Sequence, residues 1–265
     1  MRNFLPLFSF LLSSLVLNAQ VGQPVASFGN NGKVYTSLPE NFQSPNRSSI
    51  GKAVIPLQDG KTLVAIESSE GVVLTRHLAS GQRDNTYGFE GFSQKPSLEL
   101  MNGASFELMN GAKMQSNGSV LVFGIVQEFS TGIKKASITR LLPNGFIDET
   151  FGTKGLFTLN YGNLTSENEL VLLADNKIML AGTAIVNGTE NFYLARLTSN
   201  GKVDPTFGTG GMVTYENSLF NFQLRDVAVQ ADGRIIVGGN ATAPDPTSLF
   251  QLARFLPDGT PDRSF

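Results

Sequence analysis

The ionisable residues with the most regular spacing in this chain are an arginine and an aspartate that recur together, eight residues apart. The four pairs are Arg76 with Asp84, Arg140 with Asp148, Arg196 with Asp204, and Arg254 with Asp262. Such a pair could form a buried ion pair, or the carboxylate could close an Asx turn. A catalytic group normally occurs once in a chain, whereas a scaffold contact recurs with each unit. We therefore interpret the pairs as structural.

Other residue types with catalytic or metal-binding chemistry are sparse. The chain has one histidine, His77, and no cysteine. The usual zinc sites and Ser-His or Cys-His catalysis therefore lack the residues they need. Asn144 and Asp148, four residues apart beside a glycine, offer oxygen ligands, and two later copies do the same. Calcium takes six to eight oxygen ligands, so we expect no cofactor, with calcium as the alternative.

Charge and the N-terminal segment limit the partners. Twenty Lys and Arg against 22 Asp and Glu give a net charge of -2, which leaves no electrostatic footprint for nucleic acid. Residues 1–20 combine Arg2, an apolar run and a small residue at Ala19, as in a secretory signal peptide. We expect an exported protein that is extracellular, periplasmic or on the cell surface, without a transmembrane segment in residues 21–265.

The Arg–Asp pairs belong to a longer repeated string. It reads RLLPNGFIDETFG from Arg140, RLTSNGKVDPTFG from Arg196, RFLPDGTPDRSF from Arg254 and, more loosely, RHLASGQRDNTYG from Arg76. The aromatic position recurs at 28, 87, 151, 207 and 265, so we divide the chain into units 28–86, 87–150, 151–206 and 207–265. A fixed period of this length indicates one supersecondary unit copied about four times.

Each unit contains tight turns between short apolar runs. The first turn has Gly60, Gly118, Asn176 or Gly233 and is followed by a strand-like run such as TLVAI or VLVFG. Asp-Gly and Asn-Gly between apolar runs are strong hairpin signals. A second turn ends in an aromatic residue and glycine, as in Phe151-Gly152 and Phe207-Gly208. No helical periodicity occurs.

These patterns predict an all-β fold, a β-propeller of about four blades with four strands and roughly 58 residues each. A closed ring of four blades would require the strand near Phe28 to join the strand near Arg254. The alternative is an incomplete ring of a longer propeller, and we favour it because Phe265 lies in the middle of the repeated string. The duplicated segments LMNGASFE (100–107) and LMNGA (108–112) predict a lengthened loop.

The repeated string resembles the delta-60 repeat, a bacterial family whose hallmark is Arg-Leu-x-x-(Asp/Asn)-Gly-x-x-Asp-x-x-Phe-Gly. The match is nearly complete at Arg140–Gly152 and Arg196–Gly208 and looser around His77. The resemblance implies a β-propeller-like domain on exported or surface proteins. It implies no catalytic residues.

Two classes of function remain. The first is a non-catalytic scaffold that serves as a binding, adhesion or display module for a glycan or a protein, and this is the class we favour. The second is a propeller enzyme acting on polysaccharide, a glycosidase or lyase, with acidic residues at the central channel of one or two units. The non-repeated acids show no recognisable pair; they are Glu67, Glu70, Glu90, Glu99, Glu107, Glu128, Glu167, Glu169, Glu190, Glu216, Asp226 and Asp245.

Overall fold

The fold is all-β, as the sequence predicts. The computed structural model describes residues 25–38, 49–68, 71–94, 104–165, 168–215, 221–242 and 248–265. In these ranges every regular element is a strand and no helix occurs. The predicted signal peptide, residues 1–20, lies outside the described residues.

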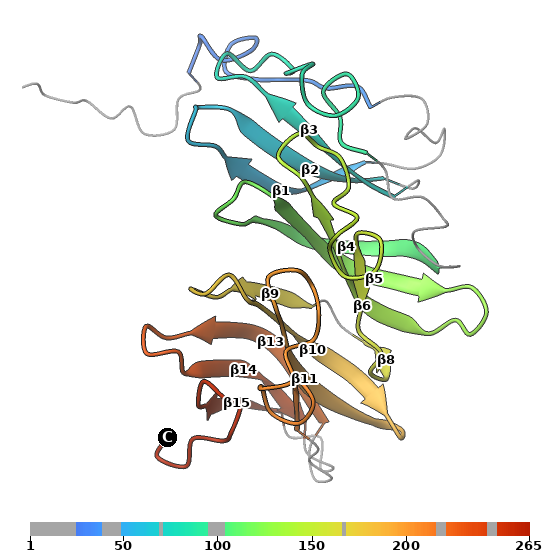
Figure 1. Ribbon diagram of the computed structural model, residues 1–265, viewed down its shortest axis with the longest axis vertical. Coiled ribbons are helices and arrows are strands. Elements are labelled where there is room, and N and C mark those ends of the chain that lie inside the picture. Colours follow the sequence, from blue (N-terminus) through green and yellow to red (C-terminus); the bar gives the residue numbers. More distant parts are fainter. Residues whose placement is uncertain are drawn as a thin grey trace, which may run out of the picture.

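The strands form four antiparallel sheets that follow one another along the chain (Figure 1). The first sheet has β1 (Ile50–Pro56), β2 (Thr62–Ser68) and β3 (Gly71–His77); the second has β4 (Ala104–Met114), β5 (Val120–Glu128), β6 (Lys134–Leu141) and β7 (Leu156–Thr158). The third has β8 (Asn163–Leu164), β9 (Glu169–Leu172), β10 (Ile178–Val186), β11 (Thr189–Leu197) and β12 (Met212–Tyr215); the fourth has β13 (Asn221–Val229), β14 (Ile235–Thr242) and β15 (Ser248–Phe255).

The predicted hairpin turns lie at the same place in all four sheets. Gly60, Gly118 and Gly233 follow β1, β4 and β13, and Asn176 follows β9. Their φ angles are 79°, 82°, 82° and 62°, respectively. The left-handed conformation is open to glycine and tolerated by asparagine. This backbone requirement explains why these two residue types occupy the turn.

The number of strands per sheet varies around the predicted four. β7 and β12 supply a fourth strand to the second and third sheets, and β8 and β9 pair side by side along β10. In the first sheet the fourth position is a single bridge between Thr75 and Phe92. Within the described part of the chain, β15 has a partner on one side only, β14. The second and third sheets extend past the predicted unit boundaries at positions 151 and 207. β7 and β12, which complete these sheets, come after the aromatic residues at those boundaries.

The duplicated segment does not lengthen a loop in the described residues. Leu108–Ala112 lies inside the eleven-residue strand β4, so that expectation is wrong for the second copy of the duplication. The pairing of β4 with β5 shifts between Phe106 and Leu108 and again between Met109 and Gly111. The strand therefore takes up extra residues as bulges. The first copy lies partly outside the described residues.

The three largest hydrophobic cores each lie between two consecutive sheets. The first includes Leu74 of β3 and Val122 of β5, the second Ile138 of β6 and Leu180 of β10, and the third Leu194 of β11 and Val237 of β14. Such packing between neighbours accounts for strand faces that are apolar on both sides. Figure 1 shows the sheets following one another from β1–β3 at the top to β13–β15 at the bottom, with residues 25–38 and β15 at opposite ends.

Candidate functional site

The repeated arginine lies in a complete set of contacts, seen most clearly in the third sheet. Arg196 donates from Nε to Asp204 Oδ2 at 2.8 Å and from Nη2 to the Thr206 hydroxyl at 3.0 Å. Its guanidinium also lies over the Phe207 ring, 4.7 Å from the centroid. Asp204 Oδ1 accepts the Thr206 N–H and hydroxyl at 3.1 and 2.7 Å. The aspartate therefore forms the ion pair and the turn at the same time, as the two compatible roles require.

The same contacts recur in the other three copies. The arginine Nε lies 2.9 Å from Asp84 in the first copy and 2.9 Å and 2.8 Å from Asp148 and Asp262 in the second and fourth. The aspartate oxygen that faces the turn binds Thr86, Thr150 or Ser264. Sequence reasoning missed these hydroxyl residues, although a Thr or Ser two positions after every aspartate was a visible signal.

Each motif also bonds to the motif of the next sheet. Nη1 of Arg76, Arg140 and Arg196 donates to the carbonyl of Pro143, Ser199 and Pro257 at 3.2, 2.6 and 2.6 Å. The glycine after the aromatic residue donates its N–H to the following carbonyl: Gly88 to Asn144 at 2.7 Å, Gly152 to Asn200 at 2.8 Å and Gly208 to Asp258 at 2.7 Å. The repeated string is therefore a latch between consecutive sheets.

A second cation completes the latch in three of the four copies. Lys61, Lys177 and Arg234, each one residue after the first hairpin turn, lie 3.4, 3.1 and 3.3 Å from Asp84, Asp204 and Asp262. Ser119 takes this place in the second copy, so Asp148 has Arg140 alone. Burial by itself would raise the pKa of Asp84, but hydrogen bonds from Thr86 and the charge of Arg76 lower that pKa to about 2.

The pKa values of the other three repeated aspartates are also lowered. The pKa of Asp262 falls to about 2 through the hydroxyl and N–H of Ser264 and the charge of Arg254. Burial opposes the shift at Asp148 and Asp204, yet hydrogen bonds from Thr150 or Thr206 and the neighbouring arginine lower the pKa of both. All four carboxylates are thus ionised at neutral pH, and their oxygens accept hydrogen bonds from arginine and hydroxyl groups.

We expect stability to fall when the medium becomes acidic. An aspartate in an unfolded chain has a pKa near 3.9, so a lowered pKa in the fold contributes stability above about pH 4. That contribution is lost as the pH falls from about 4 towards 2. The free energy of unfolding, measured against pH, should be flat from pH 5 to 7 and then decrease steeply. Asp84→Asn, which removes a carboxyl whose folded pKa is about 2, should decrease the acid slope by up to about one proton, or about 1.4 kcal/mol per pH unit; an unchanged slope contradicts the assignment.

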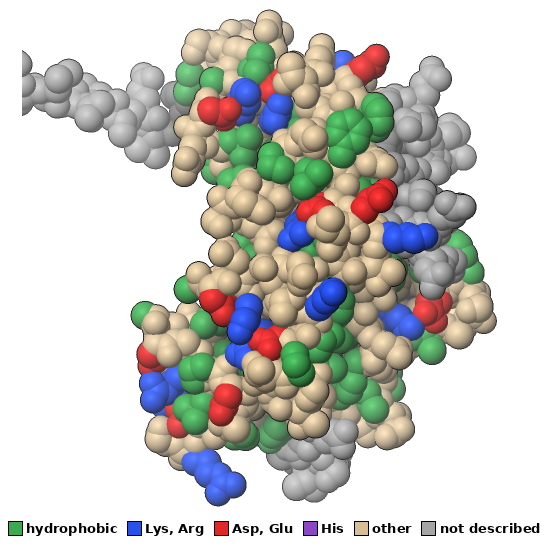
Figure 2. Space-filling model, viewed as in Figure 1, with side chains coloured by type: hydrophobic (Ala, Val, Ile, Leu, Met, Phe, Trp, Pro, Cys, Tyr) green, Lys and Arg blue, Asp and Glu red, His purple; other side chains and the backbone are tan. Residues whose placement is uncertain are grey.

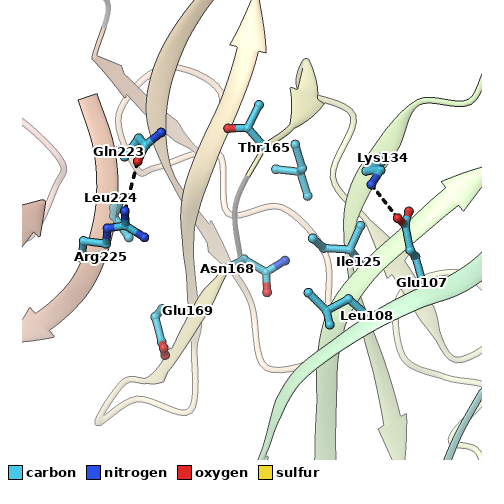
Figure 3. Close-up of a pocket in the computed structure, with 11 residues that line it drawn as sticks. Glu107, Leu108, Ile125, Lys134, Thr165, Asn168, Glu169, Gln223, Leu224 and Arg225 are labelled. Atoms are coloured by element: carbon cyan, nitrogen blue, oxygen red, sulfur yellow. Dashed lines mark hydrogen bonds and ion pairs between the residues drawn. The ribbon is translucent and has the colours of Figure 1, made fainter. Parts of the chain in front are cut away.

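The cleft with the most varied polar lining lies elsewhere, among the first strands of three sheets. It has a volume of about 500 Å³. Figure 3 shows Glu107 and Leu108 of β4 on one side and Gln223 and Arg225 of β13 on the other. The remaining lining residues are Ile125, Lys134, Leu164, Thr165, Asn168, Glu169 and Leu224. Polar groups therefore converge from three sheets over an apolar floor.

A bulge in the first strand brings variable residues to this cleft. The pairing of β13 with β14 shifts between Leu224 and Asp226, which leaves Arg225 outside the ladder. The bulged backbone passes close to the next strand: a Cβ added to Gly239 would lie 2.1 Å from the Gln223 carbonyl oxygen. Eight residues before the hairpin turn, the four sheets carry Lys52, Asn110, Asn168 and Arg225. The position holds asparagine in the second and third sheets and a cation in the first and fourth.

Hydrogen bonds and ion pairs fix several of these side chains. Lys134 Nζ lies 2.5 Å from Glu107 Oε1, and Arg225 Nη2 donates to Gln223 Oε1 at 3.1 Å. Asn168 is buried and donates from Nδ2 to the Gly124 carbonyl at 2.9 Å. Its Oδ1 is buried without a hydrogen-bond partner among the described residues. The acids Glu107 and Glu169, which the sequence left scattered, line one cleft.

His77 has a structural environment rather than a ligand-binding one. Its side chain is buried, with Nδ1 3.1 Å from the Gly81 carbonyl and Nε2 3.4 Å from the Thr36 hydroxyl. Among the described residues no group of three or more His, Cys, Asp or Glu side chains gathers as a metal site would require.

Surface charge is dispersed. Figure 2 shows Lys and Arg side chains lying beside Asp and Glu in several small groups, without a large patch of one sign on the visible face. In the ranges that the structure covers, no helix has the length and hydropathy to span a bilayer.

Comparison with known proteins agrees with this architecture. Residues 173–207 and 230–265 match the family model described as "Domain of unknown function (DUF5122) beta-propeller". The match supports a β-propeller-like repeat family. Both matched segments contain one Arg–Asp latch, around Arg196 and Arg254. No curated protein matches the chain.

The solved structures that match share little sequence identity with the chain. An endo-arabinase from Bacteroides thetaiotaomicron has 10% identity and a TM-score of 0.45, with 76% of this chain and 73% of that chain covered. A protein of unknown function from Dyadobacter fermentans has 14% identity and a TM-score of 0.43, covering 76% and 51%. A putative exo-beta-1,3-galactanase from Bifidobacterium bifidum has 10% identity and a TM-score of 0.38, covering 83% and 74%. The chain spans about half the length of the Dyadobacter protein.

Proposed function

We propose that the chain is an exported, non-catalytic β-propeller scaffold of the delta-60 type, whose four sheets act as blades of four strands each. The repeated latch holds the blades together, and the cleft between the first strands binds a glycan. The observation that carries the binding proposal is the cleft itself, where one repeated position presents Asn168 from the third sheet and Arg225 from the fourth. Repetition supports a scaffold role, and variation on a repeated frame supports recognition.

A glycan suits the cleft better than a protein does. Sugars present hydroxyl groups that amide, carboxylate and guanidinium side chains bind, and C–H faces that pack on apolar groups. The cleft offers both, with Gln223, Glu169 and Arg225 as polar groups and the partly exposed Leu108 as an apolar one. The cleft volume of about 500 Å³ is in the range of small-molecule sites and fits a few sugar residues. A stable protein interface is a broad surface of about 800 Å² on each partner, which a cleft of this size does not provide.

Binding should depend on Arg225. We expect the mature chain to bind an oligosaccharide in a glycan-array screen, and Arg225→Ala to raise Kd for that oligosaccharide at least about tenfold, because a hydrogen bond from a charged group is worth about 1.5–3 kcal/mol. Arg263→Ala, an exposed arginine outside the cleft, is the matched control. Equal affinity of both variants would place the binding site elsewhere, and a screen with no binding would refute the glycan proposal.

The second candidate is an enzyme acting on polysaccharide, and the observation that favours it is that Glu107 and Glu169 line the same cleft. Glu107 forms an ion pair with Lys134, so its carboxylate already has a partner within the protein. We therefore favour binding without turnover. The bound oligosaccharide should remain intact on long incubation. Release of shorter or unsaturated products that Glu107→Gln or Glu169→Gln abolishes would establish the enzyme instead.

A further inference from the structure

The dipeptide Asn-Gly recurs along the chain and has a chemistry of its own. The glycine nitrogen can attack the carbonyl carbon of the asparagine side chain, because glycine has no side chain to obstruct the approach and a backbone that turns freely. The asparagines of these dipeptides are Asn31, Asn102, Asn110, Asn117, Asn144, Asn187 and Asn200. All except Asn102 lie in the described residues, so the surroundings of the others can be compared.

The fold restrains all but one of these described sites. The following glycine N–H donates to a backbone carbonyl at 2.8, 3.0, 2.9 and 3.0 Å after Asn31, Asn117, Asn144 and Asn200, respectively. Gly111, which follows Asn110, is buried within β4 and pairs opposite Phe123. A nitrogen that donates a hydrogen bond, or that lies inside a paired strand, is not free to attack a side chain.

The latch adds a second restraint at Asn144 and Asn200. The backbone carbonyls of these asparagines accept the N–H groups of Gly88 and Gly152 from the preceding motif at 2.7 and 2.8 Å. The side-chain oxygen of each asparagine also accepts a hydrogen bond within its own turn. Turning either side chain towards the next glycine nitrogen therefore breaks bonds that hold the latch turn in place.

Asn187 and Gly188 lack these restraints. They form the turn between β10 and β11, with φ of 52° and 80°, and both residues are exposed. Within the described part of the chain the Gly188 N–H has no acceptor, and a Cβ added to Gly188 would meet nothing within 4 Å. The first strand pair beside the turn is Val186 with Thr189, and such hairpin ends open at a low cost in free energy.

We propose that Asn187 is the site of spontaneous deamidation in the folded protein, and that the fold protects the other described Asn-Gly sites. Base from the solvent removes the Gly188 N–H proton, and this nitrogen forms a bond to Asn187 Cγ. The bond from Cγ to Nδ2 breaks, and Nδ2 leaves as ammonia after taking a proton from water. A second water molecule opens the resulting succinimide ring at either carbonyl carbon, which gives aspartate or isoaspartate.

The modified turn lies close to a contact of the cleft. The second strand pair below the turn is Ile185 with Glu190, and Glu190 Oε2 accepts a hydrogen bond from Gln223 Nε2 at 3.2 Å. Gln223 lines the cleft. Deamidation adds a negative charge at this hairpin tip, and isoaspartate also lengthens the backbone of the turn. The assignment of the site does not depend on glycan binding.

Incubation of the mature chain in mildly alkaline buffer, followed by peptide mapping with mass spectrometry, tests the proposal. Synthetic peptides that span the same sites give the rate of each Asn-Gly without the fold. The ratio of the peptide rate to the rate in the folded chain measures protection. We expect this ratio at Asn117, Asn144 and Asn200 to exceed the ratio at Asn187 by at least about tenfold, because a hairpin end opens more often than a turn held by its own hydrogen bonds.

Asn144→Asp is the matched control, because Asp258 occupies the equivalent place in the fourth motif. This variant should leave the conversion summed over the described sites almost unchanged, whereas Asn187→Asp should remove most of it. Protection of Asn187 equal to that of Asn144 and Asn200, or faster conversion of either of them than of Asn187 in the folded chain, would overturn the proposal.

Discussion

Replacing Arg196 with alanine should lower the free energy of unfolding by about 3–5 kcal/mol, the loss expected when one partner of a buried ion pair is removed. The variant leaves Asp204 without its principal counter-charge and removes the bond to the Pro257 carbonyl. The arginine side chain is 11% exposed and that of the aspartate 6%, so water does not replace these contacts. Urea unfolding gives the comparison directly.

Arg254→Ala is the matched control for this prediction. Arg254 pairs with Asp262 in the same geometry, but it makes no bond to a following motif in the described residues. We expect a clearly smaller loss of stability, and no change in glycan affinity from either substitution. Equal losses for the two arginines would show that the contact between motifs contributes little. An unchanged unfolding midpoint for Arg196→Ala would refute the latch.

Phe207→Ala should be equally damaging, with a loss of about 3–5 kcal/mol, as for other buried phenylalanines. The Phe207 ring is fully buried in the core between the third and fourth sheets. It also lies directly against Gly259 of the next motif, where an added Cβ would come within 3.0 Å of the ring. Phe265→Ala removes the equivalent ring at its 58% exposed position and should cost far less. A similar loss in both variants, measured by urea unfolding, would contradict the role of the aromatic residue between sheets.

Much of the fold could be predicted because the same turn and strand pattern occurs four times in the sequence. Turn chemistry at Gly60, Gly118, Asn176 and Gly233 requires positive φ, and the sequence shows it directly. The Arg–Asp pair and its turn were also open to prediction, since both groups lie within eight residues of each other. The hydrogen bond from Arg140 to Ser199 could not be predicted, because the acceptor is a backbone carbonyl 59 residues away. Every residue has such a carbonyl, so the sequence does not show which one accepts.

The cleft was hidden for a different reason. Glu107 and Arg225 reach it because bulges shift β4 and β13, and a bulge depends on how two strands pair rather than on one strand alone. The same effect placed the duplicated Leu108–Ala112 inside β4 instead of in a loop. Its visible sign was a glycine six residues after the hairpin turn, as at Gly124 and Gly239, where the bulged backbone passes too closely for a side chain.

The central claim is that the repeated string joins consecutive sheets, and hydrogen exchange at three backbone amides tests it most directly. The N–H groups of Gly88, Gly152 and Gly208 lie in turns, yet each donates to a carbonyl of the next motif. We predict that they exchange as slowly as the amides of the central strands β5, β10 and β14, and that Arg196→Ala accelerates exchange at Gly208 more than at Gly88. Exchange of all three at the rate of exposed loop amides would contradict the account.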